Sequence, residues 1–402
     1  MIVVLVGIGA LVTRARLPLA VKTLVVAGLG LRVVGALARM QVAADSWVYF
    51  RWGERYAEYF AQLDFSPLVD PSLWRSVQWV GTNAVAYPAG FAIALLGPTQ
   101  FGVFLVYTLL AFSGVAAYGL AFRRSVPAED TTSYWAWLML FPSLVFWPSS
   151  LGKEALMILG LGIAAFGFLG REERANWTVV ALGVAVVFAI RPQVAAIVVL
   201  TMAMSYVLRP QNLGPLRVLE SLAILAVGLV VMANLLEPEV GDASLASVEG
   251  YVEYNSAMTA QGGSEVGAAG FGLTSIPLAI LNVLFRPFPW EAHNLSSLIS
   301  ALEVVLMWGL IYWRRRQVMA ALRNWRHSRL LRFALLFTLL YVIGLGMNIG
   351  NLGIIARQRV LVFPLLFAFV EAGAMYLRQE APAVGTARHP RGGRYPSLYP
   401  SS

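Results

Sequence analysis

The sequence predicts an all-α fold: a polytopic membrane helix bundle of about ten transmembrane helices, with juxtamembrane or re-entrant helices on its outer surface. Of the 402 residues, 58% are hydrophobic and 13% are charged, whereas soluble domains contain about 45–50% apolar and ~25% charged residues. Apolar runs near the ~20 residues that cross a bilayer recur along the chain, which leaves no room for a soluble catalytic domain. The absence of cysteine excludes disulfides, thiolate metal sites and cysteine nucleophiles.

The first predicted span covers residues 18–40. Residues 2–12 before it are apolar but short, and two arginines follow them, which is the reverse of the order in a signal peptide. We expect an interfacial segment there and leave open whether residues 1–17 form a further span. The stretch 41–98 is predicted to be an outer loop with juxtamembrane helices.

Charged flanks decide which of the later apolar runs cross the membrane. The runs lie near residues 82–97, 99–122, 132–148, 155–170, 177–190, 193–208, 218–236, 272–285, 294–313, 331–350 and 360–377. Runs 82–97 and 272–285 are short and interrupted by proline or glycine, so we treat both as re-entrant or interfacial helices outside. The arginine clusters between spans then all fall on one side, which the positive-inside rule identifies as cytoplasmic, with both termini.

Composition also assigns the remaining segments. Loop 237–293 carries acidic residues and no Lys or Arg before Arg286, so we place it outside. Residues 378–402, rich in Pro, Gly, Ser and Arg, are predicted to form a disordered cytoplasmic tail, which leaves 1–377 as a single transmembrane domain. The net charge of +9 indicates contact with membrane lipids and no nucleic-acid partner. The excess of arginine over lysine is typical of GC-rich bacteria, and we expect a bacterial inner membrane protein.

Basic residues on the outer side need an explanation other than the positive-inside rule. They are Arg51, Arg55, Arg75, Lys153, Arg191, Arg286, Arg357 and Arg359. A phosphate group at headgroup depth would explain them, because arginine and lysine bind phosphoryl oxygens well. The alternative is that each pairs with a nearby acid or extends to water.

An amphipathic helix is predicted directly after the first span. At helical spacing Asp45, Tyr49 and Trp52 share one face, and Trp47 and Arg51 share another. This places a carboxylate at the lipid–water boundary, where the head of a lipid-linked substrate would lie. The alternative is an aromatic belt with a helix-capping aspartate.

Four further outer segments carry candidate residues. In the segment before residue 155, Ser149 or Ser150 is predicted to cap the following helix, and Glu154 suits its positive N-terminus, whereas Lys153 stays unexplained. Arg191 precedes a proline that is expected to start a helix.

In the other two segments, Arg286 and Glu291 flank a proline-held turn, and Arg357 and Arg359 would share a side of an extended loop or diverge on a helix. Within the spans, Glu303 is the best candidate for a buried charge, in a structural pair or a proton relay.

The order of these features resembles the GT-C superfamily of membrane glycosyltransferases, which includes protein O-mannosyltransferases and aminoarabinose transferases. The matching features over residues 20–210 are Asp45 with Tyr49, Ala86-Tyr87-Pro88-Ala89-Gly90 followed by an apolar run to Gly97, Arg123-Arg124, Phe141-Pro142 to Pro148, Lys153-Glu154 and Arg191-Pro192. The sequence departs from the family pattern in having a single acid at Asp45-Ser46 and a single proline at Pro88.

This resemblance implies transfer of a sugar from a polyprenyl-phosphate donor to a glycan, lipid or protein acceptor at the extracytoplasmic face. Asp45 would orient or deprotonate the acceptor hydroxyl. Because the leaving group is a phosphate, positive charge helps it depart. The residues expected to bind substrate or phosphate are Tyr49, Arg51, Lys153, Glu154, Arg191, Arg286, Glu291, Arg357 and Arg359. No cofactor is required, although a divalent cation, Mg²⁺ or Mn²⁺, would bridge phosphate and carboxylate.

Other functions fit parts of the pattern. An O-antigen-type polysaccharide polymerase or ligase would use the long outer loop and the arginine pair. A lipid-linked glycan transporter would depend on central charges such as Glu303, and a non-catalytic scaffold would need neither.

Overall fold

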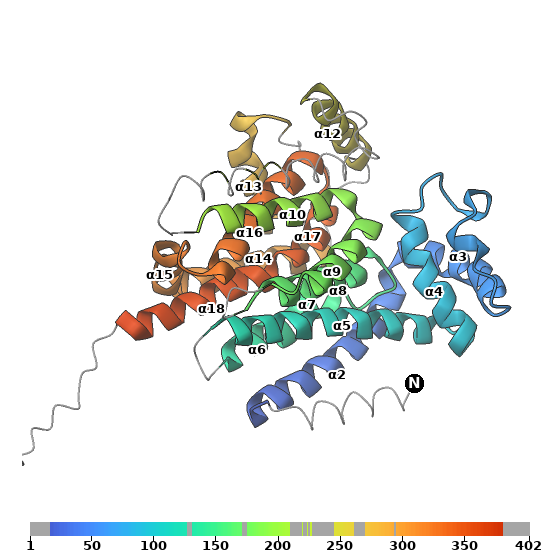
Figure 1. Cartoon of the computed structure of the whole chain (residues 1–402), viewed down its shortest axis with the longest axis horizontal. Helices are drawn as coiled ribbons and strands as arrows, with labels where there is room; N and C mark the ends of the chain where they lie inside the picture. Colours follow the sequence, from blue (N-terminus) through green and yellow to red (C-terminus); the bar gives the residue numbers. More distant parts are fainter. Residues whose placement is uncertain are drawn as a thin grey trace, which may run out of the picture.

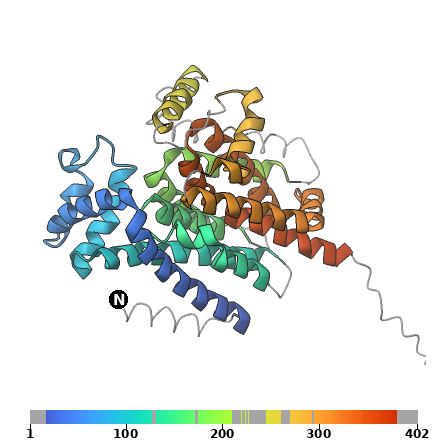
Figure 2. The ribbon, with the colours of Figure 1, turned by 180° about the vertical axis from the view of Figure 1, so that it is seen from behind.

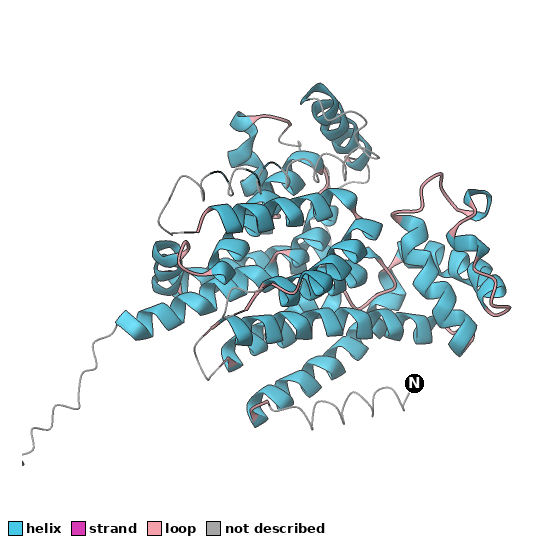
Figure 3. Cartoon of the chain, viewed as in Figure 1, coloured by secondary structure: helices cyan, strands magenta, loops and turns pink. Residues whose placement is uncertain are grey.

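The computed structural model is all-helical over the residues that it describes (Figure 3). These are residues 17–126, 131–170, 175–209, 245–260, 270–292 and 295–380, with 219, 223 and 226. The α-helices are α2 (Leu19–Val42), α3 (Ala44–Phe60), α4 (Thr82–Leu96), α5 (Gln100–Ser125), α6 (Thr132–Leu140), α7 (Pro142–Phe146), α8 (Lys153–Phe168), α9 (Trp177–Ile190), α10 (Pro192–Val207), α12 (Leu245–Thr259), α13 (Ile276–Leu284), α14 (Leu295–Trp313), α15 (Arg315–Asn324), α16 (Arg329–Asn348), α17 (Leu352–Gln358) and α18 (Phe363–Glu380). The 3-10 turns are η1 (Ser66–Leu68), η2 (Pro71–Leu73), η3 (Leu273–Ser275), η4 (Pro289–Glu291) and η5 (Arg359–Leu361).

The long helices run roughly along one axis and form the body of the molecule (Figure 1). Helix α8 lies at its centre against α5 and α9, and α16 packs against α10 and α18. Glycines permit the closest approach, since a Cβ on Gly162 of α8 would overlap the backbone of Gly114 on α5. Small residues at helix contacts are characteristic of membrane bundles, where close backbone packing replaces the hydrophobic driving force.

The bundle has two chemically different ends. At one of them Arg314, which follows α14, forms an ion pair with Glu371 of α18 at 2.6 Å. Arg329, which starts α16, donates a hydrogen bond to the carbonyl of Phe168, where α8 ends. We call this the Arg314 end. At the opposite end α2 finishes and α8 and α10 begin, close to Asp45, and we call it the Asp45 end.

Helices α3 and α4 form a separate pair that projects to one side at the Asp45 end (Figures 1 and 2). They contact each other closely because a Cβ on Gly90 of α4 would lie 2.9 Å from the Cβ of Tyr56 on α3. The Tyr56 hydroxyl donates to Asn83 at the start of α4 (2.9 Å), and Asn83 also holds the preceding loop through the carbonyl of Gln78 (2.7 Å). Run 82–97 therefore packs mainly on α3.

Apolar helices indicate a membrane protein. Three of the described helices, α2, α5 and α16, are long and apolar enough to cross a membrane. Two pairs, 297–313 with 315–324 and 352–361 with 363–378, are bent by 70° and 52° and raise the number to five if each pair is one span. Helices α4, α9 and α10 are apolar but shorter. The number of ten spans stays a prediction, and run 218–236 lies outside the described residues except for three positions.

Run 132–148, which we predicted as one continuous span, is instead broken between α6 and α7. The break falls at Pro142, which has no N–H for the helical ladder. Arg32 of α2 is fully buried beside the break. Its guanidinium donates hydrogen bonds to the carbonyls of Leu138 (2.9 Å) and Met139 (3.3 Å) in α6 and of Leu144 (3.3 Å) in α7, so a cation satisfies these buried carbonyls at the break.

Glu303 of α14 occupies the other side of the same break. Its carboxylate accepts a hydrogen bond from the backbone N–H of Ser143 (2.7 Å) and another from the Ser143 hydroxyl. A negative group at the N-terminus of α7 complements the helix dipole. The buried partner of Glu303 is thus a broken helix, which favours the structural reading of this carboxylate over a proton relay.

We expect Arg32→Met to destabilise the bundle, because three buried carbonyls lose their donor. The loss should be about 3 kcal/mol, since one hydrogen bond to a charged group contributes ~1.5–3 kcal/mol. Unfolding of the purified protein in detergent and denaturant measures it. Arg315→Met, at an exposed arginine of α15, is the control, and equal midpoints for the two variants would refute this role of Arg32.

Candidate functional site

Four predicted site residues meet at the Asp45 end. Arg357 of α17 donates a hydrogen bond to the Asp45 carboxylate at the start of α3 (2.8 Å) and forms an ion pair with Glu154 in the first turn of α8 (2.8 Å). Arg191, between α9 and α10, lies 3.6 Å from the other oxygen of Glu154. We call Asp45, Glu154, Arg191 and Arg357 the Asp45 cluster. It joins four segments that are far apart in the chain.

Local structure explains how α3 and α8 reach the cluster. The Ser46 hydroxyl donates to the carbonyl of Leu151 (2.7 Å), which ties the start of α3 to the loop before α8. Gly152 is the N-cap residue of α8, and no side chain caps it. Our expectation that Ser149 or Ser150 caps α8 is therefore wrong. Both hydroxyls instead donate to carbonyls of the preceding turn. Serine side chains often form such local hydrogen bonds to the backbone.

The other two segments are helix starts with clear sequence signals. Asn351 accepts hydrogen bonds from the N–H groups of Gly353 (2.9 Å) and Ile354 (3.2 Å), which caps α17 and sets the direction of Arg357. Pro192 occupies the first turn of α10, as predicted, so Arg191 stands at its N-cap position. Of the two readings of the arginine pair, the helical one is correct, because Arg357 lies in α17 and Arg359 begins the 3-10 turn η5 that follows it, and the two side chains diverge.

Burial differs sharply between the two carboxylates of the cluster. The Glu154 side chain is 2% exposed and the Asp45 side chain 64%. Burial raises the pKa of the Glu154 carboxyl. The charges of Arg357 and Arg191 lower this pKa by more than burial raises it, so that it lies below the ordinary value. Burial lowers the pKa of Arg357, and its ion pairs with Glu154 and Asp45 more than offset this effect, so its pKa is raised. Every member with a shifted pKa is thus held in its charged form.

Two aromatic contacts complete the surroundings of the cluster. The Tyr49 side chain is buried beside it, and burial together with the charge of Glu154 raises the pKa of Tyr49 to about 12, so that the hydroxyl keeps its proton. Arg39 of α2 is buried with its guanidinium over the rings of Phe146 (5.1 Å) and Trp147 (4.9 Å). Its field reaches Arg357 and Glu154. The sequence placed Arg39 near the end of a span without suggesting this position.

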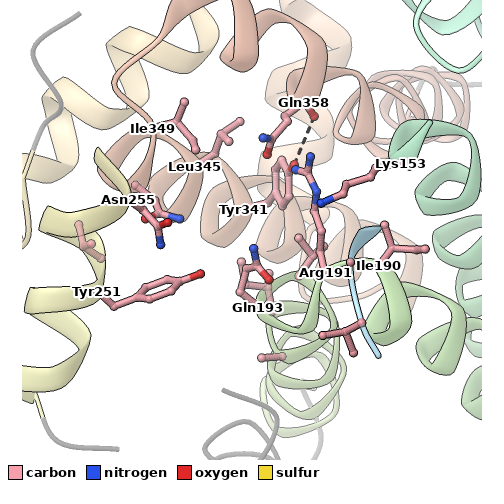
Figure 4. Close-up of a pocket in the computed structure, with 18 of the residues that line it drawn as sticks. Lys153, Ile190, Arg191, Gln193, Tyr251, Asn255, Tyr341, Leu345, Ile349 and Gln358 are labelled. Carbon is pink, nitrogen blue, oxygen red and sulfur yellow. Dashed lines mark hydrogen bonds between the residues drawn. The ribbon is translucent and has the colours of Figure 1, made fainter. Parts of the chain in front are cut away.

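A cavity of about 550 Å³ adjoins the cluster. Figure 4 shows Lys153 and Arg191 side by side on one wall, next to Tyr341 and Gln358. The Tyr341 hydroxyl donates to the backbone carbonyl of Gln358 (3.3 Å). The predicted Lys153 therefore lies on the wall of the same cavity as Arg191, so two cationic side chains line this cavity.

Sequence analysis did not identify several polar residues that line this cavity, among them Gln193, Asn255 and Asn348. For Gln193 and Asn348 the available signal was an amide near the end of an apolar run, which is costly in a membrane unless it has a partner. Asn255 lies in the predicted outer loop, where a polar residue gives no such signal.

The remaining predicted residues do not join the Asp45 cluster. The Arg286 side chain pairs with Glu291 at 2.5 Å and donates to Asn282 (3.1 Å). Arg359 is buried and donates to the carbonyls of Val283 (3.0 Å) and Arg286 (2.9 Å). These contacts hold the turn after α13 against η5, so Arg359 serves the backbone there.

Arg51 is exposed on α3, with Asp45 in the first turn of the same helix. Within the described ranges no group of three or more His, Asp or Glu side chains is arranged to hold a metal ion.

Glu154→Gln should destabilise the protein far more than Asp45→Asn. Removing the buried carboxylate leaves Arg191 and Arg357 without the charge of Glu154 between them, and breaking a buried ion pair in this way costs about 3–5 kcal/mol. The exposed carboxylate contributes at most ~1 kcal/mol. Denaturant midpoints of the two variants measure the difference, and equal losses would contradict the assignment.

The lowered pKa of Glu154 also predicts how the stability of the protein depends on pH. Because the pKa of Glu154 is lowered on folding, its contribution is present above the ordinary value of 4.5 and is lost as the pH falls through the lower folded value. The stability gap between wild type and Glu154→Gln should therefore narrow as the pH falls below 4.5.

No family model matches the chain, and neither a curated protein nor a solved structure matches it. What the Asp45 cluster does has to be inferred from its own residues.

Proposed function

We propose that the chain is an integral membrane glycosyltransferase. It would transfer a sugar from a polyprenyl-phosphate donor to a glycan, lipid or protein acceptor of the cell envelope, at the extracytoplasmic face of a bacterial inner membrane. One observation carries the proposal: an exposed carboxylate, Asp45, is linked through Arg357 and the buried Glu154 to Arg191, which lines a cavity together with Lys153. An acceptor group and a phosphate can therefore meet at this end of the bundle.

Each part of the cluster has a role in this reaction. The acceptor oxygen attacks the anomeric carbon, the bond between that carbon and the phosphate oxygen breaks, and the electron pair stays on the phosphate. Asp45 orients the acceptor hydroxyl and takes its proton. Lys153 and Arg191 stabilise the charge that develops on the leaving phosphate. Glu154 keeps Arg191 and Arg357 in place, because it is buried between them.

A second cavity supports a lipid-linked donor. It measures about 520 Å³ and is lined almost entirely by apolar atoms, among them those of Trp79, Phe91, Leu95 and Ala189. Ala189 directly precedes Ile190 and Arg191 of the charged cavity, so the end of α9 lines both cavities. A hydrocarbon chain in one and a phosphate in the other fit a single amphiphilic ligand.

The proposal predicts transfer of sugar from a polyprenyl-phosphate-linked donor by the purified protein. Asp45→Asn should lower the rate about 10²–10⁴-fold, the usual contribution of a positioned acid–base group. Glu58→Gln, at an exposed acid on the same helix, is the matched control and should keep full activity. Donor panels with radiolabelled sugars measure the rate, with and without EDTA, which decides whether Mg²⁺ or Mn²⁺ takes part.

Other outcomes would favour other functions. If Asp45→Asn stays active while Arg357→Ala is inactive on lipid-pyrophosphate glycans, the chain is a polysaccharide polymerase or ligase. If vesicles show movement of a lipid-linked glycan that survives Asp45→Asn and fails with Glu303→Gln, it is a transporter. Either result would overturn the glycosyltransferase proposal.

The orientation can be tested directly because the chain has no cysteine. Gln62→Cys lies on the exposed loop after α3, and Arg323→Cys is exposed on α15. With both termini in the cytoplasm, a membrane-impermeant maleimide added to intact cells should label the first variant and spare the second. Labelling of only the second would place Asp45 in the cytoplasm and refute the proposed site.

A further inference from the structure

Three amide groups around the charged cavity have unpaired polar atoms. The Oε1 atom of Gln193, the Nδ2 atom of Asn255 and the Oδ1 atom of Asn348 are each buried without a hydrogen-bond partner among the described residues. Leaving a buried polar atom unpaired costs about 1–3 kcal/mol, and most such atoms are satisfied in native proteins. Their concentration around one cavity indicates that an occupant of the cavity supplies the missing partners.

Asn255 lies across the cavity from its cations (Figure 4), whereas Gln193 follows Arg191 by two positions at the start of α10. Figure 4 shows Tyr251 and Asn255 on α12, facing Gln193 and Arg191. The position of α12 is set by Thr259, whose hydroxyl accepts a hydrogen bond from the N–H of Gly350 (3.0 Å). This contact joins the end of α12 to the segment after α16. The two walls thus come from separate parts of the chain.

The unpaired atoms of the three amides indicate a ligand with hydroxyl groups. The unpaired atoms of Gln193 and Asn348 are acceptors, and that of Asn255 is a donor. A hydroxyl group can satisfy both kinds, whereas an alkyl chain satisfies neither and a second anion would be repelled by the carbonyl oxygens. The apolar side chains of Leu345 and Ile349 on the same cavity suit the C–H faces of a sugar ring.

We infer that this cavity binds the glycosyl group of a sugar phosphate, with its phosphate at Lys153 and Arg191 and its hydroxyls at Gln193, Asn255 and Asn348. Helix α12 then selects the sugar. The inference rests on the proposed function for the phosphate site at Lys153 and Arg191, and it adds the residues that recognise the sugar.

Binding of soluble sugar 1-phosphates tests the inference without any transfer reaction. Isothermal titration is run in a detergent whose headgroup contains neither phosphate nor sugar, with a panel of hexose and pentose 1-phosphates and with inorganic phosphate. At least one sugar phosphate should bind wild type ten or more times tighter than inorganic phosphate. Gln193→Leu and Asn255→Leu should each weaken it about tenfold, the effect of one lost hydrogen bond, and leave inorganic phosphate unaffected.

The controls separate this inference from the proposed function. Gln62→Leu, at an exposed amide, should change nothing, and retained phosphate binding shows that the amide variants are folded. If no sugar phosphate binds better than inorganic phosphate, or if both amide variants bind like wild type, the inference is refuted. A protein that distinguishes sugar phosphates but transfers no sugar would keep the inference and refute the glycosyltransferase proposal.

Discussion

The ion pair between Glu154 and Arg357 is the interaction on which the geometry of the Asp45 end depends. A carboxylate that is 2% exposed is tolerated only with a close partner, because its desolvation costs several kcal/mol. Arg357 supplies that partner from α17 and extends to Asp45 on α3. The need to neutralise one buried acid thus fixes the position of an exposed one. The same acid, through Arg191, orients the cationic wall of the cavity.

The charges of Arg32, Arg359 and Glu303 have partners of a different kind from those of Glu154 and Arg357. Arg32 and Arg359 donate to backbone carbonyls, and Glu303 accepts from a backbone N–H. These charges replace missing helical hydrogen bonds at broken or irregular segments, which is how non-helical backbone is tolerated inside a bundle. Glu154 and Arg357 instead bind each other beside a cavity. A charge in a span is therefore a candidate for function mainly when its partners are side chains and a cavity lies next to it.

Particular residues show what could be predicted from sequence. The apolar runs predicted the helices, and the spacing of Asp45 and Tyr49 predicted the amphipathic α3. The helix start at Pro192 also followed from a local rule. The pairing of Asp45 with Arg357 could not be predicted, because 312 positions separate the two residues. Charge bias indicates on which side of a membrane a residue lies, but not which helices it faces within the bundle. Arg357 and Arg359 were equivalent in the sequence, and only the passage from α17 into η5 directs one to a carboxylate and the other to carbonyls.

The charge balance at the Asp45 end narrows what can occupy the cavity. Two carboxylates, those of Asp45 and Glu154, are surrounded by the cations Arg39, Lys153, Arg191 and Arg357. The excess is positive and lies partly out of water, where opposite charges attract more strongly. A phosphate ester matches this excess in charge, and Arg offers it paired donors. Glycosyl transfer, polymerisation and transport of a lipid-linked glycan all begin with such a phosphate. They differ in what Asp45 must do next. Glycosyl transfer and polymerisation both move a glycosyl group to an acceptor hydroxyl, for which a carboxylate that is anchored by Arg357 and open to solvent is suited, whereas transport breaks no covalent bond and needs no such carboxylate.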